Sequence, residues 1–139
     1  MSDLDEFRKT LQRQREAVDA VHHGDSGPYM ALWSQRDPVS LFGAWGPCKT
    51  GWDELSRIFQ WVGTRFSQGR NTTFDIEVAE VSGDLAYSVG YEQAQVSIDG
   101  GPVRPWRVRV THIYRREDGD WKIVHRHGDI PPEDQSPAR

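Results

Sequence analysis

The sequence predicts a single α+β domain in which helices precede an antiparallel sheet. Apolar residues recur with helical spacing up to about residue 68, and beyond it they alternate with polar residues as in strands. The size agrees, because 139 residues with 36% hydrophobic and 11% aromatic content can form one core without disulfides or bound metal. We therefore expect one domain over residues 1–130 and a flexible, Pro-rich tail over 131–139.

Three segments of the first half have helical spacing. The first predicts an amphipathic helix of about five turns, ended by Gly24, from the apolar residues Leu4, Phe7, Leu11, Val18 and Val21. A shorter helix follows over 26–36, because Ser suits a helix cap and Pro28 is tolerated in the first turn. A short strand over 39–42 and a loop over 43–51 then lead to a third helix over 52–68.

The second half reads as four strands joined by turns. Alternation of apolar and polar residues predicts strands over 74–81, 85–98, 103–116 and 121–129. Asp99-Gly100-Gly101 separates the second of these from the third, and residues 117–120 separate the third from the fourth. Both connections are hairpin signals, so three antiparallel neighbours are expected.

The faces of these strands follow from the expected pairing. If Arg116 pairs with Trp121, then Thr111 lies opposite Arg126, so that the two share a face. A one-residue bulge at Gly119 would exchange the faces of the last strand.

The turn between the second and third strands admits two registers. They pair Ile98 with Gly101 or Asp99 with Pro102, and both leave Glu92 on the face that carries Thr111. That face mixes charged and small residues, which are costly to bury unless they pair with one another, so we expect it to form a polar pocket. Its candidate ligand-binding residues are Glu92, Arg107, Arg109, Thr111 and Arg126.

The opposite face is broad, apolar and aromatic, as in a core or an interface, and it carries Trp106, Val108, Val110, His112, Tyr114, Ile123, His125 and His127. Three of its histidines could converge on a metal ion, but packing with aromatic neighbours is the favoured interpretation, so no metal site is assigned. Among the helical aromatics, Trp33 and Phe59 are the preferred pocket residues, with core packing as the alternative.

The order of elements, together with the ending Asp-Gly-Asp-Trp-Lys-Ile-Val-His-Arg-His over 118–127, resembles the SnoaL-like and ketosteroid isomerase-like superfamily. Arg109-Val-Thr111 and Gly51-Trp52 look most like its small bacterial SnoaL-like members. The superfamily also includes nuclear transport factor 2-like domains and the association domain of calmodulin-dependent kinase II. The resemblance implies a cone, formed by a strongly bent antiparallel sheet around three N-terminal helices, with a ligand pocket inside and a homodimer formed through sheet surfaces.

The resemblance does not extend to the catalytic residues of the isomerases. Their helix Tyr corresponds to Ala17 and their oxyanion Asp to Thr111, while their base corresponds to Phe42 or Gly43. Since Phe and Gly cannot accept a proton and Ala cannot donate a hydrogen bond, steroid isomerase chemistry is not expected.

In the kinase association domain, arginines project into the pocket. Glu92 and Thr111 fall near two of those positions here, and Arg107 or Arg109 would supply a cation, which favours a carboxylate-bearing or other polar ligand.

Composition narrows the classes of partner. The net charge of -4 shows no excess of basic residues that would bind the phosphates of nucleic acid. The N-terminus is acidic and no stretch is long and apolar enough for a membrane, so membrane partners are not expected. The single cysteine, Cys48, suits a reducing cytoplasm. No phosphate loop or nucleophile elbow occurs, and we expect no cofactor.

Two functions remain. The first is a homodimeric domain that binds a small, partly apolar molecule and could catalyse proton transfer of isomerase, dehydratase or cyclase type, with no catalytic residue assigned. The second is a non-catalytic module for dimerisation or association.

Overall fold

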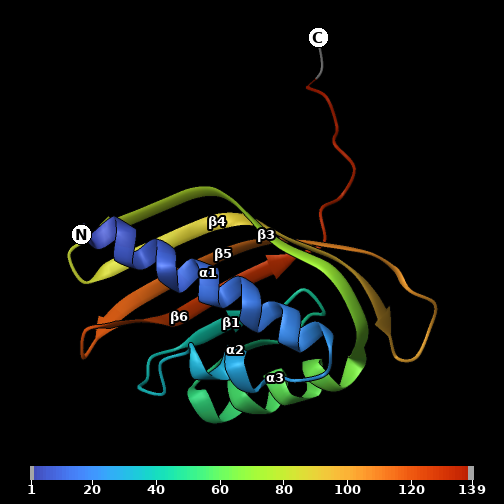
Figure 1. The fold of residues 1–139 in the computed structure, drawn as a ribbon, viewed down its shortest axis with the longest axis horizontal. Coiled ribbons are helices and arrows are strands. Elements are labelled where there is room, and N and C mark those ends of the chain that lie inside the picture. The colour runs from blue at the N-terminus through green and yellow to red at the C-terminus, as the bar shows by residue number, and fades with distance from the viewer. Residues whose placement is uncertain (1, 138–139) are drawn as a thin grey trace.

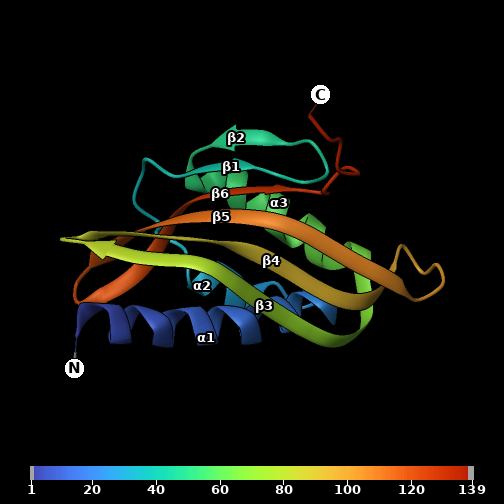
Figure 2. The ribbon, with the colours of Figure 1, turned by 90° about the horizontal axis from the view of Figure 1, so that it is seen from above.

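The computed structural model describes residues 2–137 and shows helices packed against the concave face of a curved, six-stranded sheet (Figure 1). This confirms the predicted α+β class. Viewed from above, α1 runs beneath the sheet, and β3 and β4 bend down toward its C-terminal end (Figure 2). None of the helices in the described part of the chain combines the length and hydropathy needed to cross a membrane.

The first helix is the long amphipathic one that the spacing predicts. α1 spans Asp3–His22 and starts with a capping box, in which Ser2 and Asp5 each accept a hydrogen bond from the other's backbone N–H. Its buried face includes Phe7 and Val18, but also the polar Gln14. Gly24 follows with φ of 92°, a conformation that glycine adopts without strain.

The segment after α1 holds two short strands where one was predicted. α2 spans Gly27–Ala31, β1 spans Ser40–Phe42, β2 spans Cys48–Thr50 and α3 spans Trp52–Arg65. β2 lies within the expected loop and pairs with β1. The Asp37 side chain accepts a hydrogen bond from the backbone N–H of Trp52 and so satisfies one donor at the start of α3.

Four long strands complete the chain: β3 spans Phe66–Ser82, β4 Leu85–Ile98, β5 Arg104–Glu117 and β6 Asp120–Asp129. The sheet order is β2-β1-β6-β5-β4-β3. All pairs are antiparallel except β1 with β6, so the sheet is mixed. β3 begins directly after α3 rather than at residue 74, and it bends at register shifts where Gln68 and Asn71 have positive φ.

After β6, residues 130–137 have no regular secondary structure. The last two residues of the predicted tail lie outside the described residues.

The turn between β4 and β5 places Glu92 opposite Val108, not opposite an arginine. The backbone N–H of Gly101 donates to the carbonyl of Ile98 at 3.0 Å, as one predicted register requires, but Val96 then pairs with Arg104. From Val96 to Ile98 the chain advances two residues, whereas from Gly101 to Arg104 it advances three, so the turn before β5 contains one extra residue. This extra residue exchanges the faces of β5 relative to Glu92, so the predicted grouping of Glu92 with Arg107, Arg109 and Thr111 is wrong.

The hairpin between β5 and β6 contains a second slip. Arg116 pairs with Trp121 as predicted and Tyr114 pairs with Ile123, but the next pair is Ile113 with His125. Val124 is the extra residue, so the bulge lies in the middle of β6 and not at Gly119. Beyond it, Arg126 pairs with His112 instead of Thr111 and shares the inner face with it.

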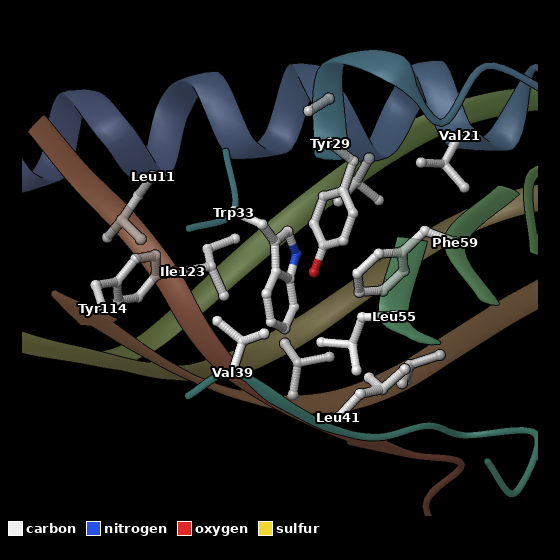
Figure 3. Close-up of a cluster of buried hydrophobic side chains, with 14 of the residues drawn as sticks. Leu11, Val21, Tyr29, Trp33, Val39, Leu41, Leu55, Phe59, Tyr114 and Ile123 are labelled. Atoms are coloured by element: carbon white, nitrogen blue, oxygen red, sulfur yellow. The ribbon is translucent and has the colours of Figure 1, made fainter. Parts of the chain in front are cut away.

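The core lies between the concave face of the sheet and the helices. In Figure 3, Trp33 lies between Tyr29 and Ile123, with Phe59 and Leu55 beside it. All five are at most 5% exposed. The face that composition marked as core or interface is, over β5, this interior: Trp106, Val108, Val110, His112 and Tyr114 are all buried.

Candidate functional site

A cavity of about 90 Å³ opens inside the domain, between the end of α1, α2, α3, the loop from β1 to β2 and the concave side of the sheet. Most of its wall is apolar and aromatic, as at Trp45, Phe59 and Trp106. Polar side chains enter it from different elements, including His22 at the end of α1 and Tyr29 of α2. Such a mixture of an apolar wall with a few convergent polar groups is typical of small-molecule sites.

A buried ion pair forms the charged part of the cavity. Arg126 donates from Nη1 to Oε2 of Glu92 at 2.6 Å and from Nη2 to Oε1 at 2.9 Å. The Glu92 and Arg126 side chains are 4% and 14% exposed. Bidentate geometry of this kind is the strongest that an arginine and a carboxylate form, and burial removes the screening by water.

The two partners belong to β4 and β6, which are not neighbours, so the Arg126 side chain crosses β5. Gly128 makes room for it. A Cβ atom at Gly128 would lie 3.2 Å from Nη2 of Arg126 and 3.2 Å from a methyl carbon of Val108. The absence of a side chain at this inner position lets the guanidinium lie close to the strand.

A chain of hydrogen bonds leads from the ion pair along the interior. Nη1 of Arg126 lies 3.5 Å from the hydroxyl of Tyr29, which lies 2.9 Å from Nε2 of His112. The amide of Gln14 lies 3.3 Å from Nδ1 of His112 and accepts a hydrogen bond from Tyr114 at 2.6 Å. Buried polar groups are costly unless paired, and this network pairs them.

Burial sets the protonation of these groups. It raises the pKa of Tyr29 to about 12, so the hydroxyl keeps its proton at neutral pH. Burial, reinforced by the cation of Arg126, lowers the pKa of His112 well below its usual range. Burial likewise lowers the pKa of His22. Burial also disfavours the charge of Arg126, but Glu92 more than offsets this and leaves the pKa of Arg126 raised.

Three of the predicted ligand-binding residues lie outside the cavity. Arg107 lies over the ring of Tyr91, with the guanidinium carbon 4.0 Å from the ring centroid. Arg109 forms an exposed bidentate pair with Asp129, at 2.8 and 2.7 Å. Thr111 pairs with neither Glu92 nor Arg126 and is half-buried on the convex face of the sheet.

The remaining predicted site residues lie inside. Glu92, Arg126 and Phe59 line the cavity. Trp33 is 1% exposed and packs against Phe59, with ring centroids 5.0 Å apart, so it supports the wall from behind. The structure therefore brings Glu92, Arg126 and Phe59 together, with Trp33 adjacent.

Sequence reasoning missed His22, Tyr29 and Gln14. A signal for Gln14 exists, since the apolar stripe of α1 skips from Leu11 to Val18 and Gln14 occupies the gap on the buried face. A polar residue on such a stripe indicates a buried hydrogen-bonding partner. Tyr29 and His22 carry no comparable signal, because aromatic residues on helices usually belong to the core.

The three histidines considered as metal ligands do not converge. His112 is fully buried on the inner face, whereas His125 and His127 pack edge-on against Phe42 on the convex face. The bulge at Val124 separates them. Within residues 2–137, no group of three or more His, Cys, Asp or Glu residues is arranged to hold a metal ion.

Comparison with known families decides the relationship of the chain. A family model described as the SnoaL-like domain matches residues 11–133. The chain belongs to the SnoaL-like family. A search of curated protein sequences finds no match.

Solved structures that include members of the nuclear transport factor 2-like family share the fold of this SnoaL-like domain. A candidate dehydratase of that family from Streptomyces avermitilis is 20% identical, with 94% of this chain and 97% of that one covered and a TM-score of 0.74. A candidate calcium/calmodulin-dependent protein kinase type II association domain from Thiobacillus denitrificans is 17% identical, with coverage of 90% and 94% and a TM-score of 0.72. The CaMKII hub of S. rosetta is 19% identical, with coverage of 93% and 97% and a TM-score of 0.69.

At these identities the likeness establishes the fold alone, and any chemistry has to be inferred from the residues of the site. The positions matched to isomerase catalytic groups do not form a polar site in this SnoaL-like domain. Ala17 is buried in the core, Thr111 lies on the convex face and Phe42 is 46% exposed. Gly43 lines the cavity without a side chain.

Proposed function

We propose that this SnoaL-like domain binds a small, largely apolar molecule in the interior cavity, with a polar group of the ligand near Glu92 and Arg126. The observation that carries the proposal is a buried, bidentate ion pair at the edge of an aromatic hollow. A buried ion pair is often no more stabilising than apolar side chains of similar volume. Its presence beside open space therefore favours a role in binding.

Proton transfer of isomerase, dehydratase or cyclase type is a finer form of this proposal. Glu92 provides a carboxylate and Tyr29 a protonated hydroxyl at the same wall. The Streptomyces relative, a candidate dehydratase, is consistent with such chemistry. Any catalysis in the cavity should then depend on Glu92 or Tyr29, and not on the positions that the steroid isomerases use.

Native mass spectrometry of the purified protein tests ligand binding directly. We expect a non-covalent adduct of low mass that disappears in the double variant Glu92→Leu, Arg126→Met. The double variant is preferable to single ones, because removing one partner of a buried pair costs about 3–5 kcal/mol, whereas replacing both is close to neutral.

The exposed pair of Arg109 and Asp129 supplies the matched control. It has the same bidentate geometry but lies on the convex face. The variant Arg109→Met, Asp129→Leu should keep the adduct. An adduct that survives loss of the inner pair, or no adduct after exposure to a library of small molecules, would refute the proposal.

A second candidate function is self-association, and the convex face of the sheet favours it. Large apolar side chains stay exposed there, with Phe42 at 46%, Tyr87 at 42% and Ile113 at 38%. Contiguous exposed apolar groups of this kind are typical of interfaces. Two similar structures are association or hub domains by description.

Light scattering coupled to gel filtration tests self-association. We expect a dimer that dissociates in the double variant Tyr87→Lys, Ile113→Lys. The control Val103→Lys alters an exposed apolar residue between β4 and β5, away from that face, and should leave the dimer intact. A wild-type protein that is monomeric at high micromolar concentration would contradict this second function.

A further inference from the structure

The charge and hydrogen bonding of the cavity define a ligand class. We infer that the cavity selects an uncharged molecule of about one ring that forms a hydrogen bond with Nε2 of His22. This inference rests on the proposed function, since it specifies what the same cavity binds. It also replaces the carboxylate-bearing ligand that the sequence favoured.

The volume limits the ligand to a small one. An apolar protein cavity of about 150 Å³ holds one benzene molecule. The cavity here has about 90 Å³ and is partly open to solvent. It is smaller than a benzene-binding cavity, so a single ring is the upper limit and would have one edge in the opening, and a fused ring system exceeds it. The wall of Trp45, Phe59 and Trp106 suits the faces and edges of such a ring.

The charges within the cavity compensate one another. Both outer nitrogens of Arg126 bind Glu92, one to each carboxylate oxygen. Tyr29 stays protonated because burial raises its pKa to about 12, and His22 stays neutral because burial lowers its pKa. An anion would have to displace Glu92 from Arg126, and a cation would face Arg126. Either would lose its hydration without gaining a free counter-charge.

His22 is a polar side chain of the cavity with an unused hydrogen-bonding atom. Its Nδ1 lies 2.8 Å from Oγ1 of Thr72 on β3. Its Nε2 has no hydrogen-bond partner among residues 2–137. It is also not among the unpaired polar atoms that are fully enclosed, so part of its surface stays accessible. The side chain is buried in the cavity wall, so this nitrogen faces the hollow.

The two hydroxyl groups of the cavity already form hydrogen bonds. The hydroxyl of Ser26 donates to the carbonyl of Phe59 at 2.6 Å, and that of Tyr29 lies 2.9 Å from His112. In a neutral imidazole one nitrogen donates and the other accepts. Nδ1 either donates to the Thr72 hydroxyl or accepts from it, so Nε2 correspondingly presents a lone pair or an N–H. A ligand hydroxyl, which both donates and accepts, can bind Nε2 in either tautomer.

Isothermal titration with four one-ring probes at pH 7.5 tests the inference: phenol, toluene, benzoate and benzylamine, the last protonated at this pH. We expect saturable binding of phenol, with toluene about tenfold weaker because it lacks the hydroxyl, and benzoate and benzylamine weaker than toluene. Benzoate binding as tightly as phenol would overturn the selection for uncharged ligands.

Variants of the histidine test the hydrogen bond. His22→Phe keeps a ring of similar size and should reduce phenol affinity to that of toluene, while toluene affinity stays unchanged. His23→Phe changes the neighbouring, half-exposed histidine and should leave both affinities unchanged. Thr72→Val removes the partner that orients the imidazole and should also lower the preference for phenol, so the test does not depend on one variant.

The role of His22 and ligand binding in the cavity can be refuted separately. A preference for phenol over toluene that survives in both His22→Phe and Thr72→Val would overturn the role of His22 and leave ligand binding intact. No binding of any of the four probes to the wild-type protein would overturn the one-ring class. An adduct in native mass spectrometry would still support the proposed function.

Discussion

Individual side chains in this domain depart from their usual ionisation because of where the fold places them. His112 and His22 are both nearly fully buried, at 0% and 2% exposure, and burial lowers the pKa of each. An exposed histidine in the unfolded chain has a pKa of about 6.5. The difference makes the free energy of unfolding depend on pH.

We predict that stability falls as the pH drops through about 6.5 toward the lowered values of the folded state. In that window the unfolded chain binds protons that the folded chain does not, so each histidine contributes a slope of up to about 1.4 kcal/mol per pH unit. Above this window both histidines are neutral in the folded and in the unfolded chain, so they no longer make the free energy of unfolding depend on pH. Urea unfolding at several pH values between 5 and 8 measures the slope.

The variant His112→Gln serves as the comparison, since Gln can hydrogen-bond without titrating. It should reduce the slope between pH 6.5 and 5 by about a third to a half, because the pKa values of His22 and His125 are lowered as well. An unchanged slope would show that His112 titrates normally in the folded state and is accessible to water.

The ion pair also shows what residue types alone can and cannot predict. Glu92 and Arg126 were expected on one face, and they do meet, but by a route that strict alternation does not give. One extra residue between Gly101 and the start of β5, and one at Val124 in β6, each exchange a strand's faces. Arg126 is separated from Glu92 by both shifts, so the two exchanges of face compensate and it stays on the face of Glu92. Arg109 is separated from Glu92 by only one shift, so it lies on the opposite, outer face.

At the scale of elements, the approach of β3 to α1 positions His22. A Cβ atom at Gly69 would lie 2.5 Å from Cβ of His22 and 3.1 Å from its backbone oxygen. The last turn of α1 therefore depends on a residue without a side chain in β3. β3 begins at Phe66, in a segment where positive φ at Gln68 and Asn71 interrupts the alternation.

We predict that Gly69→Ala separates α1 from β3 and lowers stability by about 1–3 kcal/mol, the range for overpacking a tight site. If phenol binds through His22, its affinity should fall as well. Chemical denaturation and titration measure the two effects.

Gly43→Ala is the matched control, because its Cβ would meet its nearest neighbour at 3.4 Å, in ordinary contact, and its backbone is not in a positive φ region. It should unfold like the wild type. Equal stability of Gly69→Ala and the wild type would contradict the close approach.

The elements that spacing predicts best are those with long, regular patterns. α1, β4 and β6 match their expected ranges closely. β2 has three residues, all exposed, and so carries no apolar pattern that could reveal it. The parallel pairing of β1 with β6 is equally invisible in sequence, because it joins residues some 85 positions apart through backbone hydrogen bonds.

At the scale of the whole molecule, a curved sheet closes over helices and encloses polar groups that would otherwise be hydrated. The order of elements was sufficient to predict the class and the family resemblance. Composition identified the interior face of β5, but not which residues of β4 and of the end of β6 share that face, since each bulge exchanges faces and leaves no clear mark in the sequence. The proposed ligand binding and its selectivity both depend on the enclosed pair of Glu92 and Arg126.

A double-mutant cycle on stability tests that enclosure most directly. Glu92→Gln, Arg126→Gln and the double variant give the coupling energy of the inner pair, and Arg109→Gln with Asp129→Asn gives that of the outer pair. We predict a coupling of about 3 kcal/mol or more inside, against 1 kcal/mol or less for the exposed pair. Equal, small couplings would show that Arg126 and Glu92 are exposed to water, and would contradict the account.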